Sequence, residues 1–333
     1  MKKPGCVIAF LFLAVCTSMF GNLVLLALLG VQGSSAVPTP RILRERAFEE
    51  TIVRHGTDSS SRIAVIPIEG IIAADQPGAL GPDFVQDFKQ ALQQALEDPT
   101  VKAVVLSIDS PGGEITASDV LYNAISNFRP HKPIIAYFNS IGASGAYYAA
   151  CGATEIHCNA TTFTGSIGVI ISTLNYRDLF GKVGLEAVIF KSGKFKDMLN
   201  GARELTEEEK SYVQELVMQS YSRFVGIVAN ARKLDETALR NGVADGRILS
   251  GEDAYKAKLV DGLGYIEGVY DRAAELAGVP DAQVVRYKRR VSFSDIFSLF
   301  SEARTPSLKV DLGLPMQHLR PGRAYLLPAV YAP

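Results

Sequence analysis

Two short loops of small residues are the features of this 333-residue chain that could carry chemistry. Residues 109–113 (DSPGG) and 142–146 (GASGA) each follow an apolar run of strand length. Glycine lets a backbone N–H approach a ligand closely, and a helix N-terminus directs free N–H groups at an anion. Ser144 is therefore a candidate nucleophile with an oxyanion hole beside it. It could equally be a helix cap, and Ala146 departs from the G-x-S-x-G pattern of a nucleophile elbow.

The base that would activate this serine can be sought among histidines and lysines. His157 lies in a strand-like run and His318 in a proline-rich tail, so a Ser-Asp-His triad has little support. A lysine can act instead when burial lowers its pKa from about 10.4 toward about 7–8. Lys191, Lys194 and Lys196 cluster in a glycine-containing loop. The pattern alone does not choose among them, and each could be a solvated surface charge.

Metal, cofactor and nucleic-acid chemistry are not indicated. His157 stands beside Cys158, but a zinc site needs three or four ligands and the other histidines are scattered. The 34 Lys and Arg against 35 Asp and Glu give a net charge of −1, which leaves no global excess to neutralise phosphates. The sequence therefore predicts no metal, no cofactor and no nucleic-acid partner, and it predicts that Cys151 packs in the core.

The elements that must position the two loops alternate between strand and helix. Strands are predicted at residues 63–72, 101–108, 133–138, 155–158, 169–172 and 185–190, and helices at 84–96, 115–125, 206–233 and 251–277, with a short one ending at 150. Thr206 is a predicted N-cap because three glutamates follow it, where the helix dipole favours them. This alternation predicts βαβ units and a largely parallel sheet.

Six motifs occur in the order seen in short bacterial signal peptide peptidases of the SppA type. They are PIEG at 67–70, DSPGG at 109–113, ASGAYY at 143–148, TGSIGV at 164–169, SGKFKD at 192–197 and DGRI with GEDA at 245–254. The chain resembles this family over about residues 62–275. The resemblance implies an α/β fold, the βαβ spiral of Clp protease and crotonase.

The resemblance also implies a role for individual residues. Ser144 corresponds to the nucleophile, and Lys196, in the Gly-x-x-Lys motif, corresponds to the general base. Gly113 and Gly145 would supply the oxyanion N–H groups, and Ser166 would position the lysine through a hydrogen bond. Relatives with one copy of the domain form homo-oligomeric rings whose serine and lysine can come from neighbouring subunits. A dyad contained in one chain is the alternative.

The function implied is that of a serine endopeptidase that degrades signal-peptide remnants and other short hydrophobic peptides. A crotonase-like acyl-CoA enzyme would share the fold and the oxyanion loops, but it leaves the serine and lysine motifs unexplained. An inactive homologue that acts as a membrane scaffold is a third alternative, and the intact dyad argues against it.

A hydrophobic segment at residues 7–31 predicts attachment to a membrane. Twenty of its 25 residues are apolar, and as a helix it would be roughly 37 Å long, enough to cross a hydrocarbon core of about 30 Å. Lys2 and Lys3 directly precede it, which favours a cytoplasmic N-terminus and an extracytoplasmic peptidase domain. A signal peptide cleaved near residues 34–36 (SSA) is the alternative.

The predicted organisation has four parts. Residues 1–32 form the membrane anchor, 33–61 a tether with a charged, roughly helical stalk at 41–54, 62–285 the peptidase domain and 286–333 a C-terminal extension. In the extension, an apolar stripe over residues 293–300 would lie on a membrane surface or dock as a helix on the body. The apolar tail at 325–333 (YLLPAVYAP) could occupy a groove.

Overall fold

The structure, a computed structural model, describes residues 15, 17–22, 47–74, 76–289 and 325–326. The chain divides into two compact units, Met1–Arg46 and Ala47–Pro333. In the first unit, residues 15 and 17–22 are helical, and the side chains of Met19 and Phe20 are exposed. A search of the described residues for an apolar helix of membrane-spanning length finds none. Most of the predicted anchor, and the stripe over 293–300, lie outside the described residues.

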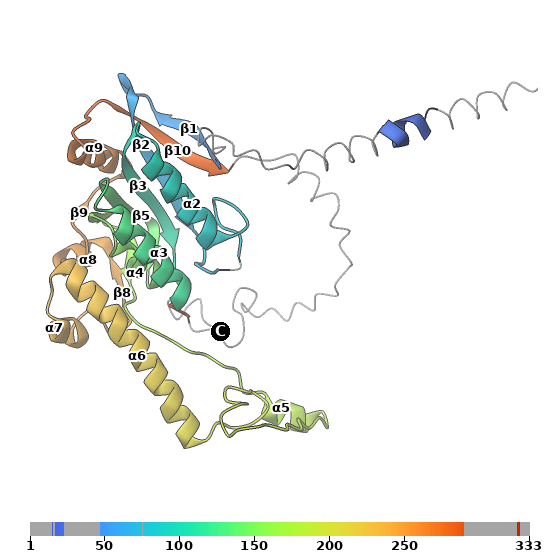
Figure 1. Cartoon of the computed structure of the whole chain (residues 1–333). Coiled ribbons are helices and arrows are strands. Elements are labelled where there is room, and N and C mark those ends of the chain that lie inside the picture. Colours follow the sequence, from blue (N-terminus) through green and yellow to red (C-terminus); the bar gives the residue numbers. More distant parts are fainter. Residues whose placement is uncertain (1–14, 16, 23–46, 75, 290–324, 327–333) are drawn as a thin grey trace, which may run out of the picture. The chain divides into compact units, whose positions relative to one another are not determined.

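The second unit is built on a sheet that has nine strands within the described residues (Figure 1). The strands are β1 (Phe48–Arg54), β2 (Asp58–Glu69), β3 (Val101–Ser110), β5 (Ile134–Ala143), β6 (Glu155–Cys158), β7 (Phe163–Gly165), β8 (Ile248–Ser250), β9 (Gly262–Leu263) and β10 (Ala282–Arg289). Their order is β1-β10-β2-β3-β5-β6-β9, with β7 pairing β5 and β8. Pairing is parallel from β10 to β9 and antiparallel for β1 with β10 and β7 with β8. The predicted α/β class is confirmed, whereas the more specific likeness to the Clp protease and crotonase spiral stays a prediction.

Helices cover both faces of this sheet, which is why its strands are apolar on both sides. The helices described in this unit are α2 (Phe84–Glu97), α3 (Ile115–Phe128), α4 (Gly145–Ala150), α5 (Arg177–Lys182), α6 (Glu207–Arg232), α7 (Glu236–Asn241), α8 (Gly251–Lys256) and α9 (Ile266–Leu276), and α5 among them lies apart from the sheet (Figure 1). In β2, Ile63 and Val65 pack toward α9, while Ile66 and Ile68 join the larger core on the other face with α2, α3 and α4. The alternation follows from the two-residue period of a strand.

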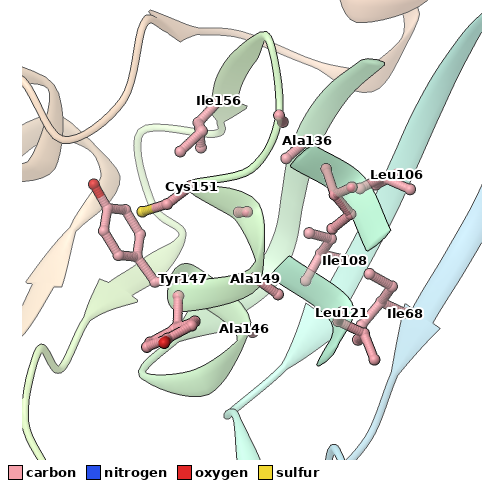
Figure 2. Packing of buried hydrophobic residues seen from close by; sticks show 14 of the residues in the cluster. Ile68, Leu106, Ile108, Leu121, Ala136, Ala146, Tyr147, Ala149, Cys151 and Ile156 are labelled. Atoms are coloured by element: carbon pink, nitrogen blue, oxygen red, sulfur yellow. The ribbon is translucent and has the colours of Figure 1, made fainter. Parts of the chain in front are cut away.

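The larger core encloses α4, the short helix that follows the second glycine loop. Every residue of α4 is buried, and Figure 2 shows Ala146, Tyr147 and Ala149 packed among strand side chains such as Ile108. The Tyr147 hydroxyl donates a hydrogen bond to the carbonyl of Leu259 at 2.7 Å. The position of α4 is therefore set by close packing on all sides.

The predicted stalk is wrong where the structure describes it. Residues 48–54 form β1 and not a helix, and β2 begins at Asp58 within the predicted tether. β1 pairs along its length with β10, a strand that the predicted domain boundary at residue 285 divides. Phe48 and Tyr287 stack across this pair, with ring centroids 6.3 Å apart. A partner strand more than 200 residues away thus overrides a local charge pattern that resembles a helix.

Residues 171–205, here called the arm, connect the sheet to α6 and have almost no core of their own. The strands predicted at 169–172 and 185–190 do not form, and α5 within the arm has no buried residue. Large apolar side chains of the arm are exposed, and Phe190 is 95% exposed. Figure 1 shows α5 and the neighbouring loop at the N-terminal end of α6, apart from the sheet. The apolar run at 185–190 pairs with no strand among the described residues.

Candidate active site

Ser144 lies at the junction of β5 and α4 in a strained conformation. Its φ of 53° and ψ of −116° lie in a region that residues other than glycine rarely adopt. Two hydrogen bonds hold the turn, from Ser144 N to Gly165 O and from Tyr148 N to Ser144 O, each 2.8 Å long. The side chain is buried, and within the described residues its Oγ has no hydrogen-bond partner. Strain together with an unpaired buried hydroxyl is typical of a functional residue.

Gly113 and Gly145 face one another beside this serine. A Cβ added at Gly145 would lie 3.0 Å from Gly113 N and 2.4 Å from Ser118 Oγ. One added at Gly113, in β4 (Gly113–Glu114), would lie 1.9 Å from Ile72 O. Only glycine fits at either position, so the two backbones approach more closely than side chains would allow. Two N–H groups next to the nucleophile are the arrangement an oxyanion hole needs.

Gly145→Ala is expected to lower kcat/KM on a peptide substrate at least about a hundredfold, because the methyl group would push the Ser144 turn away from Gly113. Peptide hydrolysis and thermal unfolding would be measured together. Gly268→Ala is the matched control, since nothing lies within 4 Å of its added Cβ on α9. Equal activity of the two variants would contradict the close approach assigned to Gly145.

Ser166 is placed next to Ser144 by strand register. Ala143 of β5 pairs with Gly165 of β7, so Ser144 and Ser166 follow at equivalent positions. Ser166 also has a positive φ, 50°, and its N–H donates to Arg247 O at 2.7 Å. Asp109, predicted to cap its loop, accepts a hydrogen bond from Ile141 N at 3.1 Å and so links the end of β3 to β5.

Lys196 lies in the arm and does not reach Ser144. Its side chain is exposed, and Ser144 Oγ has no partner among the described residues. The described residues of its own chain therefore do not supply the burial expected of a lysine base. The structure brings Ser144, Gly113, Gly145 and Ser166 together and leaves Lys196 apart.

The structure nevertheless distinguishes the three clustered lysines. Lys191 Nζ pairs with Asp197 at 2.7 Å, and Lys194 pairs with Glu208 and lies over the ring of Phe195. Within the described residues, Lys196 makes neither an ion pair nor a side-chain hydrogen bond. A carboxylate partner stabilises the charged form of a lysine. Lys196 is thus the lysine of this loop that has no carboxylate partner within the part of the chain that the structure describes.

A short strand near the C-terminus pairs with the candidate oxyanion loop, and the sequence pattern does not predict this pairing. β11 (Tyr325–Leu326) pairs antiparallel with β4, with Tyr325 opposite Glu114 and Leu326 opposite Gly113. The first two residues of the apolar tail therefore occupy a strand edge that includes one of the candidate oxyanion glycines. Residues 327–333 lie outside the described residues.

The cysteines offer no alternative nucleophile. Burial raises the pKa of the Cys151 thiol to about 12, and burial likewise raises the pKa of Cys158 to about 12. A thiol is nucleophilic only as the thiolate, so both remain inert at neutral pH. Cys151 packs in the core as predicted. Among the described residues, no three His, Cys, Asp or Glu side chains gather closely enough to hold a metal ion.

Comparison with known proteins places the chain among peptidases. Residues 127–280 match the pattern that defines Peptidase family S49. A putative signal peptide peptidase SppA of Enterococcus faecium is 38% identical over 234 residues, 69% of this chain and 68% of that protein. A putative protease of Synechocystis sp. is 38% identical over 226 residues, 68% of this chain and 78% of that protein. The chain belongs to peptidase family S49. It is a serine peptidase, and its resemblance to signal peptide peptidases of the SppA type is confirmed.

Some relatives are longer than this chain. Protease 4 of Salmonella typhi is 29% identical over 84% of this chain, which spans 44% of that protein. A solved structure of a mutant of the 1510-N membrane-bound stomatin-specific protease aligns with a TM-score of 0.40 and 16% identity, over 64% of this chain and 85% of that one.

Proposed function

We propose that this S49 peptidase is a membrane-anchored endopeptidase that hydrolyses short apolar peptides, signal-peptide remnants among them, with a dyad of Ser144 and Lys196. The observation that carries the proposal is Ser144 itself: strained, buried, without a hydrogen-bond partner among the described residues, and flanked by Gly113 and Gly145. Membership of a serine peptidase family gives this geometry its chemistry.

In the proposed reaction, uncharged Lys196 accepts the proton of the Ser144 hydroxyl while Oγ attacks the carbonyl carbon of the scissile bond. The N–H groups of Gly113 and Gly145 stabilise the negative charge on the carbonyl oxygen. The proton then passes to the leaving amine, and the peptide bond breaks to give an acyl group on Ser144. Water, activated by the same lysine, releases the acyl group as a carboxylate and restores the serine.

We propose that a second copy of the chain supplies the lysine. Ser144 and Lys196 of one chain do not meet, and the arm that carries Lys196 exposes apolar side chains such as Leu185, Val188 and Phe190. Burial of these side chains against a neighbour would cover the apolar surface and remove Lys196 from water, which favours its neutral form. Because serine and lysine lie on different surfaces, the contact is heterologous, and repetition of it closes a ring.

Peptide binding by strand addition is supported by β11. The pairing of Tyr325 and Leu326 with β4 is an antiparallel extended contact next to Gly113, made by the chain itself. Strand addition binds a peptide through its backbone, and side-chain pockets then select the sequence. Folded proteins would be poor substrates because they cannot present an extended strand.

Deleting residues 325–333 is expected to raise kcat/KM for a peptide about threefold or more through a lower KM, because the tail competes for the edge of β4. Steady-state kinetics would compare this deletion with removal of residues 329–333, which leaves the paired Tyr325 and Leu326 in place. An unchanged KM in the longer deletion would show that β11 does not lie on the peptide site.

Cleavage is expected after Ala or Leu in unstructured apolar peptides. Small residues surround the nucleophile, namely Gly113, Ala143, Gly145 and Ala146, and Ala143 and Ala146 are buried apolar residues that offer no partner for a charge. Peptides that differ only in carrying Ala, Leu, Lys or Asp before the scissile bond would be compared by kcat/KM. If peptides with Lys or Asp before the scissile bond were hydrolysed as fast as the peptide with Ala, the predicted preference for small apolar residues would be wrong.

The membrane part of the proposal rests on residues 7–31 and on the exposed apolar side chains of Met19 and Phe20 in the first unit. We propose a single-pass anchor in the cell membrane with the peptidase domain outside the cytoplasm. The full chain should stay with membranes after alkaline carbonate extraction, and protease added to spheroplasts should degrade its domain. Recovery of a soluble chain that begins near residue 37 would instead establish a cleaved signal peptide.

One experiment separates the proposed function from an acyl-CoA enzyme and from an inactive scaffold. The full chain in detergent would be treated with a fluorophosphonate probe and assayed with a fluorogenic apolar peptide. Labelling of Ser144 together with peptide hydrolysis is the expected result. No labelling and no hydrolysis would favour the scaffold, and hydrolysis of acyl-CoA without hydrolysis of peptide would favour the crotonase-like alternative.

A further inference from the structure

A chain of charged contacts joins the lysine loop to the helix that follows the arm. Asp197, the residue directly after Lys196, accepts two hydrogen bonds from the Arg203 guanidinium, from Nε at 2.7 Å and from Nη2 at 2.9 Å. The Asp197 side chain is only 8% exposed, and it also pairs with Lys191. A bidentate arginine–carboxylate contact fixes direction as well as distance.

The same arginine holds the first turn of α6. Arg203 donates to both carboxylate oxygens of Glu209, at 2.5 and 2.8 Å, and the Glu209 side chain is 3% exposed. Glu209 in turn forms a capping box with Thr206: Thr206 N donates to Glu209 Oε2 at 2.9 Å, and Glu209 N donates to Thr206 Oγ1 at 3.2 Å. The backbone beside Lys196 is thereby fixed to the start of a 26-residue helix.

These contacts take the place of a hydrophobic core in this part of the molecule. The arm buries few apolar side chains, and its best ring contact near Lys196 is the stack of Phe195 on Tyr212 of α6, 5.4 Å between centroids. In the body, by contrast, packing on all sides sets the position of α4. The lysine loop therefore depends on polar contacts for its position.

The network is charged at every pH at which a peptidase would act. The Arg203 guanidinium, followed by Lys191, holds the pKa of Asp197 far below its usual range. Hydrogen bonding from Arg203 lowers the pKa of Glu209 to about 2. At any pH above the ordinary pKa range of carboxylates, both carboxylates are charged and the contacts are present. The contacts would be lost only as the pH falls toward the lowered pKa values, so the network does not act as a pH switch.

We propose that Asp197, Arg203 and Glu209 are positioning residues that present Lys196 to the active site, and that Arg203 additionally keeps the Asp197 carboxylate away from Lys196. The proposal rests on the proposed role of Lys196 as the base. Without Arg203, the Asp197 carboxylate would keep only its contact with Lys191 and would have an oxygen available to the neighbouring Lys196, where it would favour the charged amine. Arg203 thus holds the loop in position and binds the Asp197 carboxylate, which keeps that negative charge away from Lys196.

The charged groups of this region are Lys191, Lys194 and Asp197 in the loop, Arg203 after it, and Glu208 and Glu209 on α6. Lys194 and Glu208 pair with each other, which leaves Asp197 as the carboxylate that the loss of Arg203 would release nearest to Lys196. Substitution of Arg203 and substitution of Asp197 are therefore expected to change the pH–rate profile in different ways.

Arg203→Gln is expected to lower kcat at least about tenfold, since small misplacement of a catalytic group is costly, and to move the acid-side limb of the pH–rate profile to higher pH. Asp197→Asn is expected to lower kcat without that upward shift. Arg203→Lys keeps the charge but not the bidentate contact, so it should lower kcat and leave the limb in place. Arg177→Gln, which removes two exposed ion pairs of the arm, with Asp178 and with Glu204, is the control and should match the wild type.

The experiment uses the full chain in detergent, with sedimentation and thermal unfolding recorded for every variant. Suppose that Lys196→Ala is inactive and that Arg203→Gln has the same kcat and the same pH–rate profile as Arg177→Gln. This result would overturn the inference about Arg203 and leave the proposed function standing. Activity of Lys196→Ala would overturn the proposed function first. If Arg203→Gln does not fold, then a full kcat in both Arg203→Lys and Asp197→Asn would still overturn the inference.

Discussion

Ser144→Ala and Lys196→Ala are each expected to abolish peptide hydrolysis, with a loss of about 1,000-fold or more, while the protein remains folded. Nucleophile and base act as one unit, so the double variant should be no less active than either single variant. The change at Ser144 removes only a hydroxyl that has no hydrogen-bond partner among the described residues, and Lys196 is exposed, so neither should reduce stability greatly. Hydrolysis of a fluorogenic peptide and thermal unfolding check both statements.

Lys194→Ala is the matched control for Lys196→Ala, two residues away in the same loop. Lys194 pairs with Glu208 at the surface and covers the ring of Phe195. Exposed ion pairs contribute about 0–1 kcal/mol to stability, so this variant should lose little activity. A loss at Lys194 as large as that at Lys196 would mean that the loop as a whole, and not one amine, is required.

The sheet and its helices could be predicted where local pattern and tertiary packing agree. The run at 101–108 is apolar because β3 is buried on both faces, and the spacing at 84–96 is helical because one side of α2 lies on the core. Thr206 is recognisable as a cap from the glutamates behind it, and the structure shows the full capping box. These features are set by residues within a few positions of one another.

Elements that depend on distant partners could not be predicted. β1 is exposed at most positions and becomes a strand by pairing with β10, which itself lies between β1 and β2. The run at 185–190 has the composition of a strand but lies exposed in the arm, where it pairs with no described strand. Composition shows that a segment is apolar. It does not show which surface covers the segment, or whether that surface belongs to the same chain or to another copy.

The candidate site shows the same division. Gly145 and Ser144 are adjacent in sequence and mark a turn, but the approach of Gly113 to Gly145 follows from the packing of β4 on Ile72. The family resemblance singles out Lys196 among the three lysines, whereas the ion pairs that distinguish it from Lys191 and Lys194 are seen only in the structure. Charge pairing across a loop leaves no periodic signal, so sequence pattern alone could not supply it.

Co-expression of Ser144→Ala with Lys196→Ala is expected to restore activity that neither variant has alone. If the dyad forms between copies, a site is complete where the Ser144 of a Lys196→Ala chain meets the Lys196 of a Ser144→Ala chain. Random mixing in a closed ring would complete about a quarter of the sites. Differently tagged chains, purified through both tags, would be assayed for peptide hydrolysis per site against the wild type.

The control is the pair Ser144→Ala with the double variant, which contains no intact serine and should stay silent. A dyad within one chain predicts silence for the test pair as well, because every chain in it lacks one of the two residues. Two observations argue for complementation. The arm is exposed, with Phe190 at 95% exposure, and Lys196 does not contact Ser144 within the described residues. Silence in co-purified, folded assemblies would place both catalytic residues in a single chain and would require the arm to fold back toward α4.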